Sequence, residues 1–385
     1  LINARDENGV TREFSQADQQ IAESLASQAA VAMTNNKLID EQRELFESFI
    51  KLMASAIDEK SPYTGGHCKR VPELTMMIAE ACHQCDYGPI KDFQMTDKDR
   101  YELTIAGWLH DCGKVTTPEY VVDKATKLET IYDRINTVDT RFEVLKRDAT
   151  IEMLEQKLAR LKSDPAADYS DLESAHEAKL AQLDDDRDFI RKSNIGGEYM
   201  DETSQQRVRD IGEYRWQDPH GVNAKFFNKN ELENLTISKG TLTDDERHII
   251  NNHMAVTIKM LAQLPFPQHL ENVPEYAGGH HERMDGKGYP NGLTREQMSL
   301  QARMMGIADI FEALSASDRP YKTGKPLTEC LRILGFMKED HHIDPDIFDV
   351  FVREKVYERY AREFLPKDQI DEVKVEDIPG YQANA

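Results

Sequence analysis

The sequence predicts a mainly all-α protein with a long N-terminal connecting helix and an inserted helical hairpin. Three observations favour this class. Between residues 15 and 60 the chain has neither glycine nor proline, and apolar residues recur at helical spacing. Helical patterns return over 62–123 and again from Thr243, and little strand signal follows residue 15. The composition, 39% hydrophobic and 31% charged residues, fits helices with long solvated faces.

The N-terminal segment predicts one tight turn followed by one long helix. A strand or two should flank the Asn8-Gly9 turn. The helix is expected to start after Ser15, with Asp18 three residues on as its capping partner. It should continue through 41–61 as a connecting helix and break at Ser61-Pro62. A helix this long rarely stands alone, so part of its apolar stripe is expected to pack on a partner.

The rest of the chain divides into a helical domain in two parts and an insertion between them. The domain comprises 62–123 and 236–365, and 366–385 follow as a C-terminal tail. In the insertion, 124–235, two charged helices at about 126–162 and 169–193 should form an antiparallel hairpin around Asp164-Pro165. Residues 194–235 are expected to be a loop-rich return. A turn-rich stretch at 278–292 interrupts the second part of the domain.

The charge balance and the cysteines exclude several classes of protein. Lys and Arg number 48 against 70 Asp and Glu, and the net charge of −22 argues against a nucleic-acid or anionic-membrane partner. No apolar run approaches the ~20 residues of a membrane span, so we expect no membrane insertion in this chain. Five scattered cysteines suit a reducing cytoplasm rather than a disulfide framework. The lone pair Cys82 and Cys85 is expected to be structural.

Histidines and aspartates in unusual settings are the candidates for chemistry. His110-Asp111 lies in the apolar stretch AGWLHDCGKV. The two residues are either metal ligands or a polar pair at the end of a helix. His280 and His281 can both bind a metal only if the backbone turns, which Gly278-Gly279 permits. Asp309 lies in an apolar helix, where an unpaired carboxylate would be costly. Such ligands suit iron, manganese, cobalt, nickel or zinc rather than magnesium or calcium.

Further candidates gain weight only from their neighbours. His248 and His253 lie five residues apart and cannot easily share a helix face, so at most one should be a ligand. A phosphate ester would need fixed cations, which Lys114, Arg319 and Lys322 offer. Each of them alone would more often be a surface charge.

Taken in order, these motifs resemble the HD-GYP family of the HD phosphohydrolase superfamily. The similarity rests on HDCGK, HHE, DGKGYP, IADIFEAL and DRPYK, and it runs from Tyr63 and His67 to the stretch that starts at His342. It implies an HD-type helical bundle. It also implies hydrolysis of cyclic di-GMP to linear pGpG, and in some members to GMP, by a metal-activated hydroxide.

The resemblance also implies roles for individual residues. Two divalent ions, iron or manganese, are expected, with Asp111 bridging them and Lys114 contacting the scissile phosphate or the hydroxide. Arg319 and Lys322 would grip the phosphates, and the loop with Asp285, Gly286 and Tyr289 would shape the pocket edge. The implied catalytic residues are His110, Asp111 and Lys114. The implied metal ligands are His67, His110, Asp111 and Asp309 for one ion, and Asp111, His253, His280 and His281 for the other.

Three features depart from that pattern or add to it. Tyr63 stands where some relatives place a carboxylate for a third metal, so two metals are expected here. The stretch 124–235 is inserted where the family usually runs without interruption. Residues 1–40 resemble the last strand and helix of a GAF sensor domain, whose connecting helix typically pairs in parallel with a second copy. The resemblance therefore implies a parallel homodimer through the N-terminal helix, and contact of the GYP loop with cyclic-di-GMP synthases.

Two other functions remain open at this stage. One is a receptor in which the same pocket binds the nucleotide without turnover and signals through the linker helix or the GYP loop. Because a fold does not fix its substrate, a nucleotide phosphohydrolase or a di-iron oxygenase is the other alternative. The GYP motif and the Arg319–Lys322 stretch argue against both of these enzymes.

Overall fold

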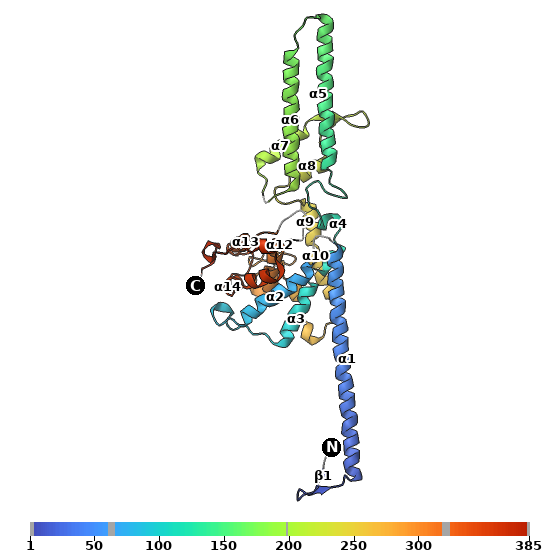
Figure 1. Ribbon diagram of the computed structural model, residues 1–385, viewed down its shortest axis with the longest axis vertical. Coiled ribbons are helices and arrows are strands. Elements are labelled where there is room, and N and C mark those ends of the chain that lie inside the picture. Colours follow the sequence, from blue (N-terminus) through green and yellow to red (C-terminus); the bar gives the residue numbers. More distant parts are fainter. Residues whose placement is uncertain (1–3, 61–65, 198, 318–323, 383–385) are drawn as a thin grey trace.

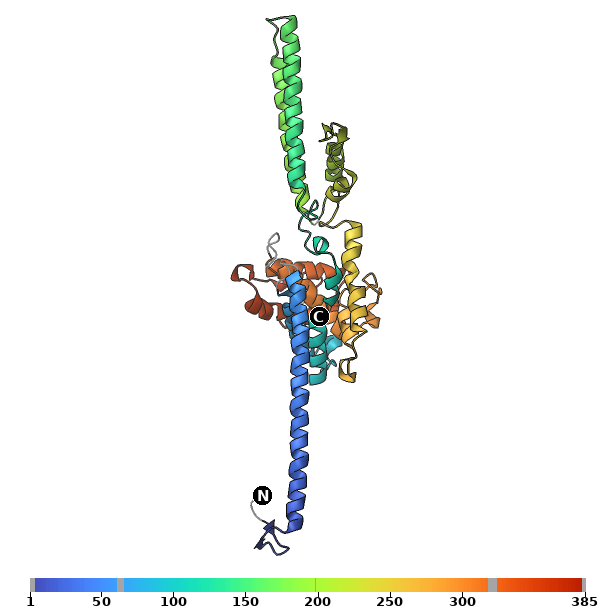
Figure 2. The ribbon, with the colours of Figure 1, turned by 90° about the vertical axis from the view of Figure 1, so that its right-hand side faces the viewer.

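A computed structural model describes residues 4–60, 66–197, 199–317 and 324–382. Two views at right angles show an elongated molecule with a compact centre (Figure 1 and Figure 2). Helix α1 extends from this centre in one direction, and helices α5 and α6 extend in the opposite direction. The mainly all-α class is confirmed, since the strands in the described part of the chain form only two short hairpins.

The N-terminal segment folds as the sequence predicts. The short strands pair antiparallel, and the backbone N–H and hydroxyl of Ser15 donate to Asp18 at 2.8 and 2.7 Å, just before the helix. Only Ile50, Ala54 and Ile57 of the long helix are buried, so most of its length projects away from the centre (Figure 1). The elements are β1 (Ala4–Arg5), β2 (Thr11–Arg12) and α1 (Gln16–Lys60).

The central bundle combines helices from both sides of the insertion. Helix α2 contacts α1, α3, α12, α14 and α15, so it lies at the middle of the bundle. The core side chains Leu74, Ile78, Phe311 and Phe348 are fully buried, and burying one such side chain contributes about 1.5–3 kcal/mol. This packing fixes the helices of the bundle relative to one another. They are α2 (His67–His83), α3 (Asp97–Leu109), the 3-10 helix η2 (Cys112–Thr116), α4 (Glu119–Val122), α9 (Asp244–Asn251), α10 (His253–Leu261), α11 (Val273–Gly278), α12 (Leu300–Ser315), α13 (Leu327–Glu339), α14 (Pro345–Arg353) and α15 (Val356–Phe364).

The insertion forms the predicted helical hairpin with a small core of its own. Helices α5 and α6 lie side by side and are joined at their far end (Figure 1). A separate apolar cluster that includes Phe142, Ile190 and Phe226 fills the base of the hairpin. The elements are α5 (Ile135–Ser163), α6 (Ser170–Ile195), α7 (Glu202–Gly212), β3 (Arg215–Gln217), β4 (Asn223–Lys225) and α8 (Lys229–Leu235).

Two details of the predicted insertion are wrong. Helix α5 begins at Ile135 rather than near residue 126, because the Glu129 carboxylate accepts the backbone N–H groups of Ala125 and Thr126 and holds this stretch in turns. The predicted loop-rich return, 194–235, contains α7, α8 and the β3–β4 hairpin. These elements have between 3 and 11 residues, too few for a clear periodic pattern.

The two ends of the insertion meet at Lys124. Its buried ammonium donates to Asn234 Oδ1 at 2.6 Å and to both carboxylate oxygens of Glu246, at 2.8 and 2.6 Å. Its carbonyl accepts the Thr241 hydroxyl at 2.9 Å. Glu246 also caps the start of α9 through Thr243. The insertion therefore leaves and rejoins the central bundle at one point.

The remaining segments add three findings. Residues 366–382 of the C-terminal tail pack on the bundle, where Gln369 Nε2 donates to the carbonyls of Ser315 and Lys325 at 3.0 and 3.1 Å. In the part of the chain that the structure describes, every helix is too short or too polar to cross a membrane. All five cysteines are buried and free, Cys82 and Cys85 among them.

Candidate metal centre

The structure brings together side chains from the ends of four helices and from within a fifth. Their ligand atoms form three overlapping groups, and within each group the atoms lie within 4.8 Å of one another. The groups contain the seven side chains that the resemblance implies as metal ligands. His67 opens α2, His110 and Asp111 follow α3, His253 opens α10, His280 and His281 follow α11, and Asp309 lies within α12.

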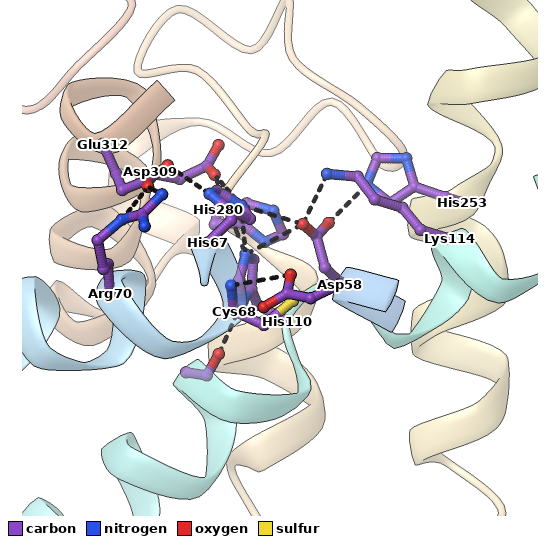
Figure 3. Close-up of polar contacts among 12 residues, drawn as sticks. Asp58, His67, Cys68, Arg70, His110, Lys114, His253, His280, Asp309 and Glu312 are labelled. Carbon is purple, nitrogen blue, oxygen red and sulfur yellow. Dashed lines mark hydrogen bonds and ion pairs between the residues drawn. The ribbon is translucent and has the colours of Figure 1, made fainter. Parts of the chain in front are cut away.

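One group surrounds the His67 imidazole (Figure 3). The Nε2 atom of His67 lies 3.2 Å from Asp111 Oδ2, 3.3 Å from Asp309 Oδ1 and 3.4 Å from His110 Nε2. His110 Nε2 is 3.3 Å from Asp111 Oδ2. Ligand atoms ~2.1 Å from one cation are themselves separated by ~3–3.5 Å. The three atoms around His67 Nε2 therefore lie at the distances from it that ligands of one cation have, while His110 Nε2 and Asp309 Oδ1 are 3.9 Å apart.

A second group lies on the other side of Asp111. His253 Nε2 is 3.3 Å from Asp111 Oδ1, whereas the first group contacts Oδ2 of the same carboxylate. The His281 ring meets the His253 ring edge to face at a centroid distance of 5.3 Å, and its centroid is 4.2 Å from that of His280. Asp111 thus presents one oxygen to each group.

Backbone carbonyls orient three of the imidazoles. The Nδ1 atoms of His110, His253 and His280 lie 2.7, 2.5 and 2.7 Å from carbonyl oxygens three residues earlier in the chain. A carbonyl oxygen only accepts, so each Nδ1 carries the hydrogen and each Nε2 turns its lone pair toward the centre. The fourth ring, His67, directs Nδ1 to the Glu312 carboxylate instead.

Unpaired buried atoms test whether these residues suit a cation. Asp111 Oδ1, His253 Nε2 and His280 Nε2 are buried and have no hydrogen-bond partner among the described residues. All three are acceptors in this arrangement and cannot bond one another, and an unsatisfied buried polar group costs about 1–3 kcal/mol. Divalent cations would satisfy all three. Imidazole nitrogens and carboxylate oxygens together fit transition-metal ions, so the residues present suit such a group.

Burial and neighbouring charges set the protonation of the centre. Burial lowers the pKa of His281 to about 4 and also lowers the pKa of His280. Burial opposes ionisation of Asp111, but Lys114 and His110 hold its pKa well below the usual value. Contacts with His67 and His281 likewise lower the pKa of the buried Asp309. At neutral pH the centre therefore offers neutral His280 and His281 and ionised carboxylates, the forms that bind cations.

Close packing of α10 on η2 brings His253 beside Asp111. A Cβ atom on Gly113 would lie 2.0 Å from the His253 carbonyl oxygen, and the Gly113 N–H donates to Thr257 Oγ1 at 2.9 Å. Only glycine allows this approach. The exposed His248, five residues earlier on α9, takes no part in the centre.

Among the described residues, Lys114 brings a positive charge into direct contact with Asp111. Its Nζ lies 2.6 Å from Asp111 Oδ2. Burial disfavours the ammonium, but Asp111 and Asp309 outweigh burial and raise the pKa of Lys114. Lys114 therefore stays protonated at neutral pH and acts as a charge, not as a base.

The GYP loop reaches the centre through Tyr289. Its ring stacks on His281 with centroids 4.9 Å apart and an interplanar angle of 24°. Asp285 faces elsewhere and binds Arg283 at 2.9 Å, while Gly286 has a positive φ of 74° that shapes the turn. Tyr63, Arg319 and Lys322 lie outside the described residues.

Sequence reasoning missed two supporting residues and misjudged two glycines. Glu312 and Arg70 form a buried pair behind His67, and the one available signal was that Glu312 follows Asp309 by a single helical turn. Gly278 and Gly279 do not adopt positive φ. They are needed for close packing, since a Cβ atom on Gly279 would lie 2.9 Å from Ala302 Cβ.

Comparison with known proteins identifies part of the chain. Residues 226–347 match the HD domain family. The match starts before residue 236 and contains His253, His280, His281 and Asp309. It does not extend to residues 1–40, whose likeness to a GAF tail stays a prediction.

Curated relatives are cyclic-dinucleotide phosphodiesterases. A 3'3'-cGAMP-specific phosphodiesterase of Vibrio cholerae serotype O1 is 33% identical over 189 residues, covering 48% of this chain and 33% of that protein. A cyclic di-GMP phosphodiesterase of Pseudomonas aeruginosa is 40% identical over 114 residues, covering 30% and 26%. A cyclic di-GMP phosphodiesterase of Thermotoga maritima is 31% identical over 133 residues, covering 34% and 35%. The chain thus spans between 26% and 35% of these relatives. It contains an HD domain that is related to cyclic-dinucleotide phosphodiesterases.

Proposed function

We propose that this chain is a metal-dependent phosphodiesterase that hydrolyses cyclic di-GMP to linear pGpG, with GMP as a further product to be tested. The observation that carries the proposal is the position of Asp111 between two groups of imidazoles, one on each carboxylate oxygen. We propose that two divalent ions, iron or manganese, occupy these groups. The metal ligands would be His67, His110, Asp111 and Asp309 for one ion, and Asp111, His253, His280 and His281 for the other.

The residues divide the work of phosphodiester hydrolysis between them. Bound cations would supply Lewis acidity, which lowers the pKa of water and offsets negative charge on a phosphoryl group. Lys114 would donate to an oxygen of the scissile phosphate, because it remains charged beside Asp111. Tyr289 would form an aromatic wall of the pocket beside His281. By resemblance, Arg319 and Lys322 would bind the other phosphate oxygens.

A second substrate has support of its own. The relative that matches the longest stretch of the three compared here is named as specific for 3'3'-cGAMP. Both cyclic dinucleotides carry the same phosphodiester groups and differ in one base, so the proposed metal centre would act on either. The base contacts would decide between them.

The assay offers both dinucleotides to one metal-loaded protein. The full chain is purified without oxygen, loaded with Fe²⁺ or Mn²⁺, and its products are separated by chromatography. We expect cleavage of cyclic di-GMP by the parent and none by His110→Ala or Asp111→Ala, with circular dichroism unchanged. His248→Ala is the matched control, because His248 is exposed and outside the centre.

Each outcome of this assay has one meaning. Full activity of Asp111→Ala would contradict the assignment. Preferential cleavage of 3'3'-cGAMP would replace the substrate and keep the reaction. Binding of a dinucleotide without turnover in either metal would favour the non-catalytic receptor that signals through the linker helix or the GYP loop.

We also propose that two copies pair in parallel along α1. Val31, Leu38, Leu45 and Leu52 recur every seven residues on this helix and are between 51% and 64% exposed in the single chain. A seven-residue apolar repeat is the seam of a coiled coil. The cytoplasmic setting rests on the five free cysteines. The GAF-like start of the chain and the contact of the GYP loop with cyclic-di-GMP synthases rest on resemblance to known families.

A further inference from the structure

The last turn of α1 forms one wall of the metal centre. A small pocket is lined by Ile57, Asp58 and Lys60 of α1 together with Val122 and four residues at the centre or next to it. Figure 3 shows Asp58 reaching from α1 toward the backbone of Cys68. The connecting helix therefore ends on the site rather than beside it. These four are His67, Asp111 and Lys114 of the centre and Cys68, which follows His67 in the chain.

Asp58 holds the start of α2. The backbone N–H of Gly66 donates to Asp58 Oδ2 at 3.1 Å, and the N–H of Cys68 donates to Oδ1 at 3.3 Å. These two groups flank His67. The first N–H groups of a helix lack partners within the helix, and Gly66 has no side chain with which to cap them. A carboxylate from another helix supplies the cap, so α1 fixes the backbone that carries His67.

Lys60 holds the segment that follows Asp111. Its Nζ donates to the carbonyl oxygens of Lys114, Val115 and Thr117 at 3.2, 2.6 and 2.6 Å. An ammonium group has three hydrogens, and each has an acceptor here. The three carbonyls lie at the end of η2, which starts directly after Asp111. The second contact of α1 therefore fixes the backbone that carries Lys114.

We infer that Asp58 and Lys60 are positioning residues that set the spacing between His67 and Asp111, and thereby the affinity of the centre for divalent cations. They stand two residues apart on one rigid helix, so their two contacts hold both ligand segments in one relation. Any displacement of α1 along its axis reaches His67 and Asp111 together. The inference rests on the proposed metal site and is independent of which dinucleotide is the substrate.

The test uses Mn²⁺ alone as the probe of the full chain. Lys60→Met keeps the aliphatic stem and removes the three donated hydrogen bonds. Loss of groups that orient metal ligands typically costs ~10–100-fold in affinity, and we expect a loss in this range by calorimetry. Lys60→Arg should restore the affinity to within ~3-fold of the parent, because the guanidinium also donates several hydrogen bonds. Lys51→Met, on the exposed part of α1, is the matched control and should match the parent.

A spectroscopic readout separates positioning from general stability. The low-temperature EPR spectrum of the Mn²⁺-loaded protein reports the coupling of the bound ions, and it should change in Lys60→Met and in Asp58→Asn. Asp58→Asn also serves if Lys60→Met does not fold. Parental Mn²⁺ affinity and an unchanged spectrum in these variants would overturn the inference. A parent that binds Mn²⁺ but cleaves no cyclic dinucleotide contradicts the proposed function alone, and a parent that binds no Mn²⁺ overturns both.

Discussion

The Nδ1 atom of His67 and the Oε2 atom of Glu312 lie 2.5 Å apart inside the bundle. Glu312 is fully buried, and its other oxygen accepts the Nε–H of Arg70 at 2.7 Å. Burial alone would lower the pKa of His67, but Glu312, Asp111 and Asp309 raise it. His67 and Arg70 in turn hold the pKa of Glu312 near 2, against the effect of burial. A fixed negative charge therefore stands behind the imidazole, and it would strengthen the other ring nitrogen as a ligand of a bound cation.

The first prediction concerns this carboxylate. Glu312→Gln keeps the shape of the side chain and removes its charge, so His67 becomes a weaker ligand. We expect the Mn²⁺ dissociation constant to rise by ~10–100-fold, measured by calorimetry. Glu363→Gln, at an exposed position on α15, should leave the constant unchanged. Equal affinities in the two variants would show that Glu312 serves only the packing of α12.

The second prediction tests the contact between η2 and α10. Gly113→Ala places a methyl group where the His253 carbonyl oxygen already lies, so α10 must move away from Asp111. Overpacking of this kind costs about 1–3 kcal/mol, and we expect a lower thermal midpoint together with weaker Mn²⁺ binding. Gly197→Ala is the control, because nothing lies within 4 Å of a Cβ atom there. A Gly113→Ala protein with parental stability and affinity would refute this account of the contact.

The third prediction concerns pH and the buried Lys127 at the base of the insertion. Its Nζ donates to the Ile237 carbonyl at 2.7 Å, and burial lowers its pKa from 10.5 to about 8. Between these two values the unfolded chain binds more protons than the folded one, so the free energy of unfolding rises with pH. Below about pH 8 the buried charge of Lys127 therefore destabilises the folded state to its full extent. This destabilisation decreases as the pH rises toward 10.5.

Lys127→Met should remove this rise. Urea unfolding of parent and variant is measured at several pH values between about 7 and 10. The free energy of unfolding of the parent should increase relative to that of the variant across this range. Lys229→Met, at an exposed position, controls for the loss of one positive charge. If the free energies of unfolding of the parent and of Lys127→Met differed by the same amount at every pH, this would contradict the lowered pKa of Lys127.

The fourth prediction tests pairing along α1. We expect the parent to sediment as a dimer at micromolar concentration. Leu38→Glu combined with Leu45→Glu should give monomers, because two charges would enter the apolar seam. Asn36→Glu adds a charge at an exposed position on the other side of the helix, two residues before Leu38, and should leave the dimer intact. A monomeric parent, or a dimeric double variant, would rule out this interface.

Much of the fold follows from local sequence signals. The absence of glycine and proline from 15–60 predicted α1, and Asp164-Pro165 marked the tip of the hairpin. The start of α5 could not be predicted, because it depends on where the Glu129 side chain bonds the backbone rather than on periodicity. The three-residue strands β3 and β4 are too short to differ in pattern from a loop.

The site was predictable where its residues carry a motif and hidden where they do not. His110-Asp111 stands out because an adjacent polar pair in apolar surroundings is unusual, and His280-His281 stands out as two adjacent histidines after two glycines. Asp58, Lys60 and Glu312 carry no such mark, since they act on groups brought near only by folding. His67 and Glu312, for example, are 245 residues apart in the chain. Their roles follow from distances, not from composition.

The meeting of both ends of the insertion at Lys124 makes the hairpin a detachable module. Because the insertion leaves and rejoins the central bundle at one point, it can be removed without distorting the bundle. A short linker would join the two ends. Asn234 and Glu246 touch the same ammonium, so this gap is already closed. A chain shortened in the laboratory by this hairpin would need few compensating changes to keep Lys114 and His253 in place.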